Sequence, residues 1–229
     1  MTRRNSMPLG QTLPAACGSG VLGYEYGMAS HGCLFTVISR VASAHTPRVS
    51  KHRVFVWLPP TVLANDGTIV FARDDDYFFG VLHSRLHEVW ARAQGTQLRE
   101  EESGARYTPT TSFETFPLPW PPRKEPEVDP SYTAIANASR ELVEKRDAWL
   151  AGVDPSDKKP RSLTRLYNER PTWLDLVHRR LDAAVAAAYG WSADMTDDQI
   201  LERLLALNHV RTTTAALIPE PVTHPAASL

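Results

Sequence analysis

The stretch that divides this chain runs Arg106-Tyr-Thr-Pro-Thr-Thr-Ser-Phe-Glu-Thr-Phe-Pro-Leu-Pro-Trp-Pro-Pro122. Its prolines remove backbone donors throughout, so the stretch cannot form a long helix. Phe113, Phe116 and Trp120 lie between the prolines, and we interpret them as packing anchors. We therefore predict an extended strap across a preformed surface, with short strands and one helix before it and helices after it.

The residues before the strap predict an α+β fold. Residues 34–42, 54–58 and 68–72 are rich in β-branched and aromatic side chains, which is typical of strands. A basic connection at 46–53 joins the first two strands, and Asn65-Asp-Gly67 is a turn signal before the third. Apolar residues at helical spacing predict one main helix over 77–93, with acceptors at Asp74-Asp-Asp76 for its N-terminus. We expect a small mixed or antiparallel sheet with this helix.

The residues after the strap predict an α-helical C-terminal segment. Amphipathic patterns cover 131–150 and 172–189, and Thr196 with Gln199 forms a capping box before a last helix ending near Asn208. The expected organisation is a poorly structured N-terminal segment at 1–33, an α+β domain at 34–122, a helical C-terminal domain at 123–211 and a disordered tail at 212–229.

Composition limits the kinds of partner. Charged residues make up 22% of the chain and the formal net charge is -1, so nucleic-acid binding would need a local basic patch. The only cysteines, Cys17 and Cys33, suggest neither a disulfide framework nor a paired-thiol zinc site. We expect a reducing, cytoplasmic location and no membrane partner, because no apolar run approaches the length of a membrane span.

Three stretches together resemble a known family. They are Thr46-Pro-Arg-Val-Ser-Lys-His-Arg-Val-Phe-Val-Trp57, Phe79-Gly-Val-Leu-His-Ser-Arg-Leu-His-Glu-Val-Trp90 and the strap from Arg106 to Pro119. In order and spacing they resemble the target-recognition domain of MmeI-like type IIG restriction–modification enzymes, which are adenine-specific DNA methyltransferases. Leu166-Tyr-Asn168, 178–191 and 200–208 resemble the helical segment that follows in this family. The resemblance spans roughly 36–211.

The resemblance implies a DNA sequence-recognition fragment of a site-specific adenine-N6 methyltransferase. Double-stranded DNA is the implied partner, and S-adenosylmethionine is the cofactor of the full-length family. The sequence has no Asn-Pro-Pro motif, and its glycine-rich stretch Pro14-Ala-Ala-Cys-Gly-Ser-Gly20 lacks the flanking strand and helix of a cofactor loop. The family's nuclease motif is also missing. We therefore expect no cofactor and no methylation by this chain alone. The chain would be a truncated product or a separately encoded specificity fragment, with a separate methyltransferase or nuclease chain as a candidate partner.

The candidate DNA-binding residues fall in two groups. One is the basic cluster, and the other offers donors at the start of the strap; together they are Arg48, Lys51, His52, Arg53, Arg106, Tyr107, Thr108 and Thr110. The alternatives stay open: the cluster could be a solvated loop, Tyr107 a packed ring, and the threonines partners of the backbone.

Other polar groups predict no catalytic or metal site. Ser84 and His87 lie one turn apart, but no acid or oxyanion hole is apparent, so we favour structural histidines or a DNA-facing turn over a hydrolase. His178 and Asp182 are predicted to form a surface pair. The aspartates at 74–76 are predicted to cap a helix rather than bind metal. The competing function is a protein–protein interaction or scaffold module whose helices from Ser131 onward bind a partner, with no role on DNA.

Overall fold

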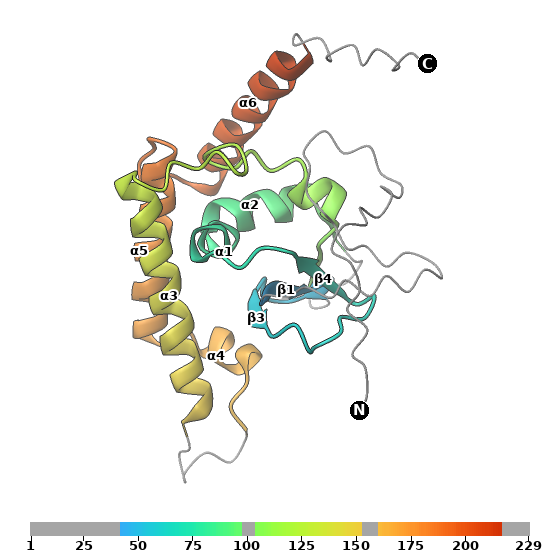
Figure 1. Ribbon diagram of the computed structural model, residues 1–229, viewed down its shortest axis with the longest axis vertical. Helices are drawn as coiled ribbons and strands as arrows, with labels where there is room; N and C mark the ends of the chain where they lie inside the picture. The colour runs from blue at the N-terminus through green and yellow to red at the C-terminus, as the bar shows by residue number, and fades with distance from the viewer. Residues whose placement is uncertain (1–41, 98–103, 153–159, 217–229) are drawn as a thin grey trace, which may run out of the picture.

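The computed structural model describes residues 42–97, 104–152 and 160–216. The predicted segment 1–33, the strand predicted at 34–42 apart from Ala42, and residues 217–229 of the predicted tail lie outside this range. Figure 1 shows short strands on one side of the molecule and long helices on the other. This arrangement confirms the predicted α+β class with small antiparallel sheets and a C-terminal helical region.

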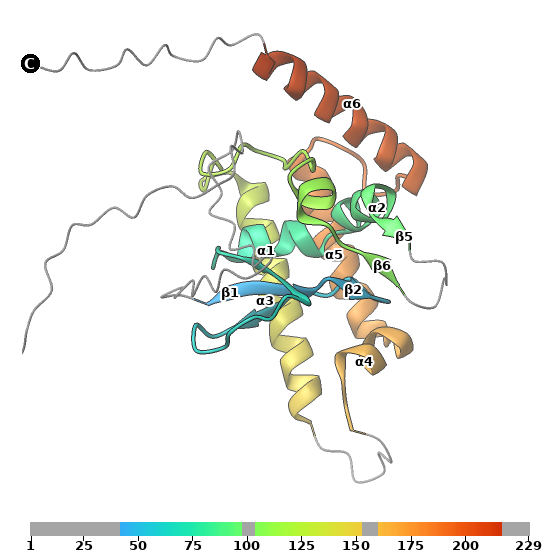
Figure 2. The same ribbon diagram turned by 90° about the vertical axis from the view of Figure 1, so that its right-hand side faces the viewer.

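Each sheet has three antiparallel strands. In the first, β1 (Ser43–Pro47) lies between β3 (Val56–Leu58) and β4 (Thr68–Phe71). In the second, β6 (Ala105–Arg106) lies between β2 (Val49–Ser50) and β5 (Thr96–Gln97). The two sheets are interleaved along the chain, because β2 falls between β1 and β3, and they lie side by side, as Figure 2 shows.

Along the chain, a single residue, Arg48, separates β1 of the first sheet from β2 of the second. Its backbone N–H donates to the Gly67 carbonyl at the first sheet, and its carbonyl accepts from the Tyr107 N–H at the second, both at 2.8 Å. A one-residue bend at Arg48 thus leads directly from β1 in the first sheet to β2 in the second. The predicted connection at 46–53 starts too early, because Thr46 is fully buried within β1 and its hydroxyl donates to the Val54 carbonyl over 2.9 Å.

The main helix predicted at 77–93 is two helices, α1 (Asp76–His83) and α2 (Arg85–Gln94). Ser84 separates them with an extended backbone at φ -71° and ψ 153°. Its buried hydroxyl donates to the Val81 carbonyl at 2.7 Å and accepts from the His87 N–H at 3.4 Å, so it serves both helix ends. The predicted cap of the first helix is confirmed, because the Asp75 carboxylate accepts from the Phe78 N–H at 2.8 Å.

The strap lies across the helices but is not extended throughout. Residues Pro109–Phe113 form a π-helical turn, η2, with Pro109 at a position where a helix needs no donor. Phe113, Phe116, Pro117, Leu118 and Pro119 are buried, which confirms the predicted packing role of the two phenylalanines. The Tyr189 hydroxyl donates to the Pro117 carbonyl at 2.8 Å, and Arg211 donates to the carbonyls of Leu118 and Pro119.

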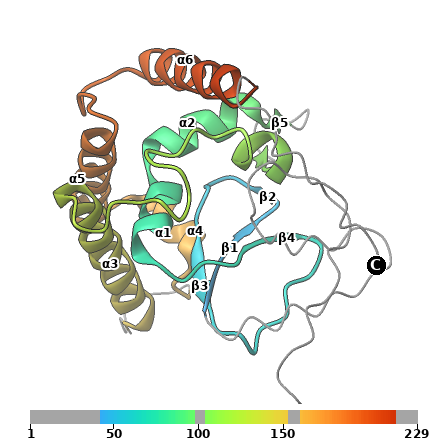
Figure 3. The same ribbon diagram turned by 45° about the horizontal axis from the view of Figure 1, so that its top comes forward.

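Among the described residues after the strap there are four helices: α3 (Pro130–Ala151), α4 (Leu163–Glu169), α5 (Thr172–Ala188) and α6 (Asp197–Ala216). α3 and α5 run side by side, and α6 extends away from them across α2 (Figure 3). The sequence does not predict the helix at 163–169, and the last helix continues into residues 212–216, within the predicted disordered tail. The predicted capping box is present, with Thr196 and Gln199 each accepting from the other's backbone N–H. Within the described residues, no helix is both long and apolar enough to cross a membrane.

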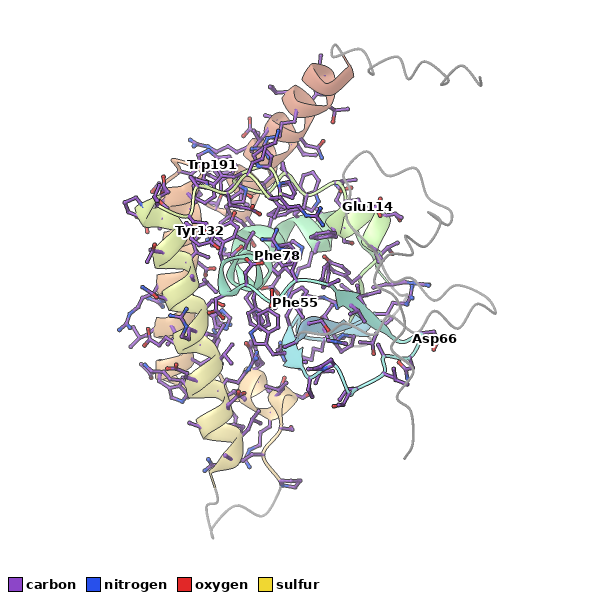
Figure 4. All side chains as sticks on the ribbon, in the orientation of Figure 1. Phe55, Asp66, Phe78, Glu114, Tyr132 and Trp191 are labelled. Atoms are coloured by element: carbon purple, nitrogen blue, oxygen red, sulfur yellow. The ribbon has the colours of Figure 1, made fainter. Side chains whose placement is uncertain are left out.

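One hydrophobic core connects the sheets to the helices. Phe55 and Phe71 from the sheet region meet Phe78 of α1, and Ile135 and Leu142 of α3 belong to the same cluster. Figure 4 places Phe55 and Phe78 in the interior between sheet and helices. α1 approaches α3 at Gly80, where a methyl group would lie only 2.8 Å from Cγ2 of Ile135. The sheets, and the loop between β2 and β3, are therefore supported by a packed helical layer.

Candidate nucleic-acid interface

The basic cluster predicted at 48–53 lies where the chain passes through β2 in the second sheet and then turns back towards β3. We call residues 48–53 the basic loop. Arg48 begins it, and its Nε donates to the carbonyl of Asp66, 2.8 Å away in the exposed 59–67 turn. Figure 4 places Asp66 on the outer side of the sheets, away from the layer formed by α3 and α5. The two terminal guanidinium nitrogens of Arg48 have no protein acceptor among the described residues.

The tip of the basic loop contacts α4. Lys51 Nζ donates to the side-chain oxygen of Asn168 at 3.0 Å, and His52 Nε2 lies 2.8 Å from the same oxygen. The imidazole of His52 also packs against the ring of Tyr167, with centroids 5.9 Å apart. Lys51 is exposed and His52 half-buried, so the ammonium group remains open to solvent.

Arg53 has a structural position. Its guanidinium donates to the Ala105 carbonyl at 2.8 Å, to the Thr46 hydroxyl at 3.2 Å and to the Pro47 carbonyl. It also lies over the ring of Tyr107, 5.0 Å from the centroid. Burial lowers the pKa of Arg53 to about 10, which leaves it charged at neutral pH. These contacts connect the two sheets, and they leave Arg53 less available to a ligand than its neighbours.

The candidate residues at the start of the strap also divide into accessible and structural side chains. Tyr107 is buried, with its hydroxyl 3.0 Å from Nε2 of His87. Arg106 is exposed on β6 opposite Val49, and its guanidinium has no partner within the described part of the chain. Thr110 is exposed, whereas Thr108 is half-buried and its N–H donates to the hydroxyl of Ser112 at 3.3 Å. Arg106 and Thr110 are thus accessible, and Tyr107 is a core residue.

Arg106 lies on the strand next to the start of the basic loop, although the two are distant in sequence. Val49 pairs with Arg106, and Arg48 hydrogen-bonds to Tyr107, so the start of the basic loop and the start of the strap are adjacent strands. The structure places Arg48, Lys51 and Arg106 in and beside this region. Positive groups supported by a rigid sheet can contact phosphates and donate to base edges.

The histidines near Ser84 are structural. His83 Nε2 accepts from the Phe55 N–H at 3.1 Å, and His87 Nδ1 lies 2.8 Å from the Leu82 carbonyl. Burial lowers the pKa of both, for His87 to about 4. Ser84 is fully buried with its hydroxyl engaged by helix ends, which leaves it out of reach of a substrate.

The predicted surface pair of His178 and Asp182 is wrong. His178 is buried, 3.2 Å from the Tyr167 hydroxyl, and burial lowers its pKa to about 4. Asp182 accepts from the Arg85 N–H at 2.7 Å, and burial raises its pKa to about 6. Across residues 42–97, 104–152 and 160–216, no three His, Cys, Asp or Glu side chains gather as a metal site would require.

Asn168 is the residue of this region that sequence reasoning missed. It lay within a stretch that resembled the helical segment of the family, but residue type alone does not place it beside Lys51 and His52. Their contact joins positions that are 117 and 116 residues apart in the chain.

Fold and site together define an α+β module, in which small antiparallel sheets present a basic loop and helices support them. The sequence of this module is similar to a known family of protein domains. Residues 26–120 match the family model described as "MmeI, target recognition domain". This segment is therefore similar to the MmeI target recognition domain.

Two relatives agree with this assignment. DNA methyltransferase A of Bacillus subtilis (strain 168) is 28% identical over 149 residues, which cover 64% of this chain and 15% of the relative. The structure of the type IIL restriction–modification enzyme MmeI in complex with DNA superimposes with a TM-score of 0.62 at 24% identity, over 76% of this chain and 22% of that one. This second likeness shows a shared fold. The chain thus spans less than a quarter of the length of either relative.

Proposed function

We propose that this chain recognises a double-stranded DNA sequence for an adenine-N6 DNA methyltransferase of the restriction–modification type. The observation that carries the proposal is the match of residues 26–120 to a target recognition domain, together with a basic loop at the sheet surface of that segment. The relatives are a DNA methyltransferase and an enzyme whose structure was determined with DNA, which supports the same assignment.

The charges of the region suit a phosphate backbone. The chain as a whole has a net charge of -1, so bulk attraction to DNA is absent and affinity must come from local cations. Arg48, Lys51 and Arg106 supply such cations from a fixed scaffold. We propose that Lys51 contacts phosphate and that Arg48 and Arg106, whose planar guanidinium groups can donate two parallel bonds, contact phosphates or guanine edges. His52, Thr108 and Thr110 would add polar contacts, while Arg53 and Tyr107 would hold the scaffold.

Catalysis would belong to another part of the assembly. We propose that S-adenosylmethionine binds to a methyltransferase part, in the same polypeptide or in a separate chain, and that the module described above positions that part on DNA. The cytoplasm, where DNA-modifying enzymes meet the chromosome, is the proposed compartment.

The test is DNA affinity as a function of salt, measured with a labelled mixed-sequence duplex. We expect the combined variant Arg48→Ala, Lys51→Ala and Arg106→Ala to bind more weakly, with the slope of log affinity against log salt reduced by about 0.9 for each lost phosphate contact. The matched control removes three exposed cations from α3 and α5, Lys145, Arg179 and Arg180, and should keep the wild-type slope.

The competing function is a protein-interaction module, and the exposed side chain of Leu205 on α6, 46% accessible, is the observation in its favour. Absence of duplex binding by the wild-type chain at every salt concentration, alone and with a methyltransferase core added, would reject the DNA proposal. Equal losses in the basic-loop and control variants would reject the assigned surface.

A further inference from the structure

We propose that Asn168 is a positioning residue for DNA binding, which holds the tip of the basic loop while leaving the charge of Lys51 available. This inference rests on the proposed DNA-binding function and adds to it a role for the helical segment. The observation behind it is one amide oxygen that meets both Lys51 Nζ at 3.0 Å and His52 Nε2 at 2.8 Å.

The two ends of the basic loop are fixed by the sheets, but its tip is not. Arg48 has backbone bonds to both sheets, and Arg53 donates to Ala105 and Thr46. Between them, within the described part of the chain, the side-chain hydrogen bonds of Lys51 and His52 all lead to Asn168. A long lysine side chain loses considerable rotamer freedom on binding, so a partner that limits this freedom beforehand lowers the entropic cost of a phosphate contact.

Asn168 is itself held in place by α4. Ser162 caps the start of the helix, because its hydroxyl accepts from the Arg165 N–H. Arg170 caps the end with a left-handed backbone at φ 41°. Leu166 is fully buried and Tyr167 nearly so, with the Tyr167 hydroxyl 3.2 Å from His178 of α5. The exposed amide of Asn168 follows these two anchors directly, so its position is determined by the packing of α4 on α5.

The chemistry of an amide suits this role. Its oxygen accepts from two donors at once but carries no formal charge. Lys51 is therefore oriented without being neutralised, and its remaining N–H donors stay free for a phosphate oxygen. A carboxylate at the same position would orient the loop equally well, but it would pair with the ammonium group and compete with DNA.

The test compares Asn168→Ala and Asn168→Asp in the full chain, with the labelled mixed-sequence duplex as probe. We expect Asn168→Ala to bind about threefold to tenfold more weakly, because the tip must be ordered on binding. Asn168→Asp should bind more weakly still and reduce the salt slope by about 0.9, as loss of the Lys51 phosphate contact would. Asn137→Asp is the matched control, since Asn137 is also an exposed helical asparagine whose amide oxygen accepts from a basic side chain, here Arg140 at 3.0 Å.

A double-mutant cycle separates positioning from general support of the fold. Asn168→Ala should have no further effect on affinity in the background Lys51→Ala, His52→Ala, because its action passes through those two residues. Thermal unfolding of each variant reports whether the fold is intact, and Asn168→Asp, which preserves size and an acceptor, serves if the alanine variant is unstable.

The outcomes distinguish this inference from the proposed function. Wild-type DNA binding with unchanged affinity in both Asn168 variants would overturn the role of Asn168 and leave the function standing. Tighter binding by Asn168→Ala would also overturn it, since it would mean that the amide restrains the loop against DNA. Lack of DNA binding by the wild type would instead overturn the proposed function.

Discussion

At the scale of single residues, buried titratable groups connect the fold to pH. His83, His87 and His178 have pKa values lowered by burial, for the last two to about 4 from an ordinary value of 6.5. The folded chain therefore binds fewer protons than the unfolded chain between pH 4 and pH 6.5, and their contribution to stability is lost as the pH falls. Asp182 acts in the opposite direction, because burial raises its pKa to about 6 from 3.8.

We expect the three histidines to dominate the pH dependence of stability, because they outnumber Asp182. The free energy of unfolding should rise between pH 4 and pH 6.5 by about 2–3 kcal/mol per pH unit near its steepest point. The measurement is urea denaturation at a series of pH values. Asp182→Asn removes the opposing titration but keeps an acceptor for the Arg85 N–H, so this variant should show a steeper rise. A shallower rise would contradict the assignment of Asp182.

The residue scale also shows what sequence could and could not predict about the site. The basic cluster and the start of the strap were recognisable from residue type and from a family resemblance. The sequence could not show that Arg53 is the structural cation of the cluster, because its acceptor, the Ala105 carbonyl, is 52 residues away. Tyr107 was left open between packing and DNA contact, and its burial against Phe55 and His87 depends on the assembled core.

At the scale of elements, the contact between α1 and α3 depends on the absence of a side chain at Gly80. A methyl group there would lie 2.8 Å from Cγ2 of Ile135 and 3.2 Å from the Ile135 carbonyl oxygen. We expect Gly80→Ala to lower the free energy of unfolding by about 1–3 kcal/mol, because the helices must separate to admit it. Gly67→Ala is the control in an exposed turn, and it should stay within about 0.5 kcal/mol of the wild type in the same denaturation experiment. Similar values for the two variants would show that the helices can separate at little cost.

The elements that sequence missed have physical explanations. The apolar spacing continues through Ser84, with Leu82 and Leu86 on either side, so periodicity alone cannot show that a buried hydroxyl ends one helix and begins the next. β1 lacks strand alternation because Ser43, Ala44, His45 and Thr46 are all buried. α4 buries only Leu166 and Tyr167, too few residues for an amphipathic signal. The long amphipathic helices α3 and α5 were predicted almost to the residue, because their periodic faces extend over several turns.

At the scale of the whole molecule, the sequence-based boundary at residue 122 crosses a continuous core. Phe78, on the N-terminal side, and Leu142 and Leu174, on the C-terminal side, belong to one buried cluster. We expect residues 42–216 to unfold in a single transition, and residues 34–122 expressed alone to lack stable tertiary structure, because separation would expose the α1 surface that α3 covers. Hydrogen exchange monitored by mass spectrometry would check this, and independent protection of the 34–122 fragment would contradict it.

The one-residue link at Arg48 between β1 and β2 has a consequence for how related proteins can change. Alternate residues of a strand face opposite sides, so inserting or deleting one residue between 43 and 50 would invert the side chains of one sheet relative to the other. The turn at 59–67 is exposed throughout and carries no such constraint. We therefore expect insertions and deletions among homologues to occur in the 59–67 turn and to be rare between residues 43 and 50. The exposed turn could then vary in length while the register of both sheets stays the same.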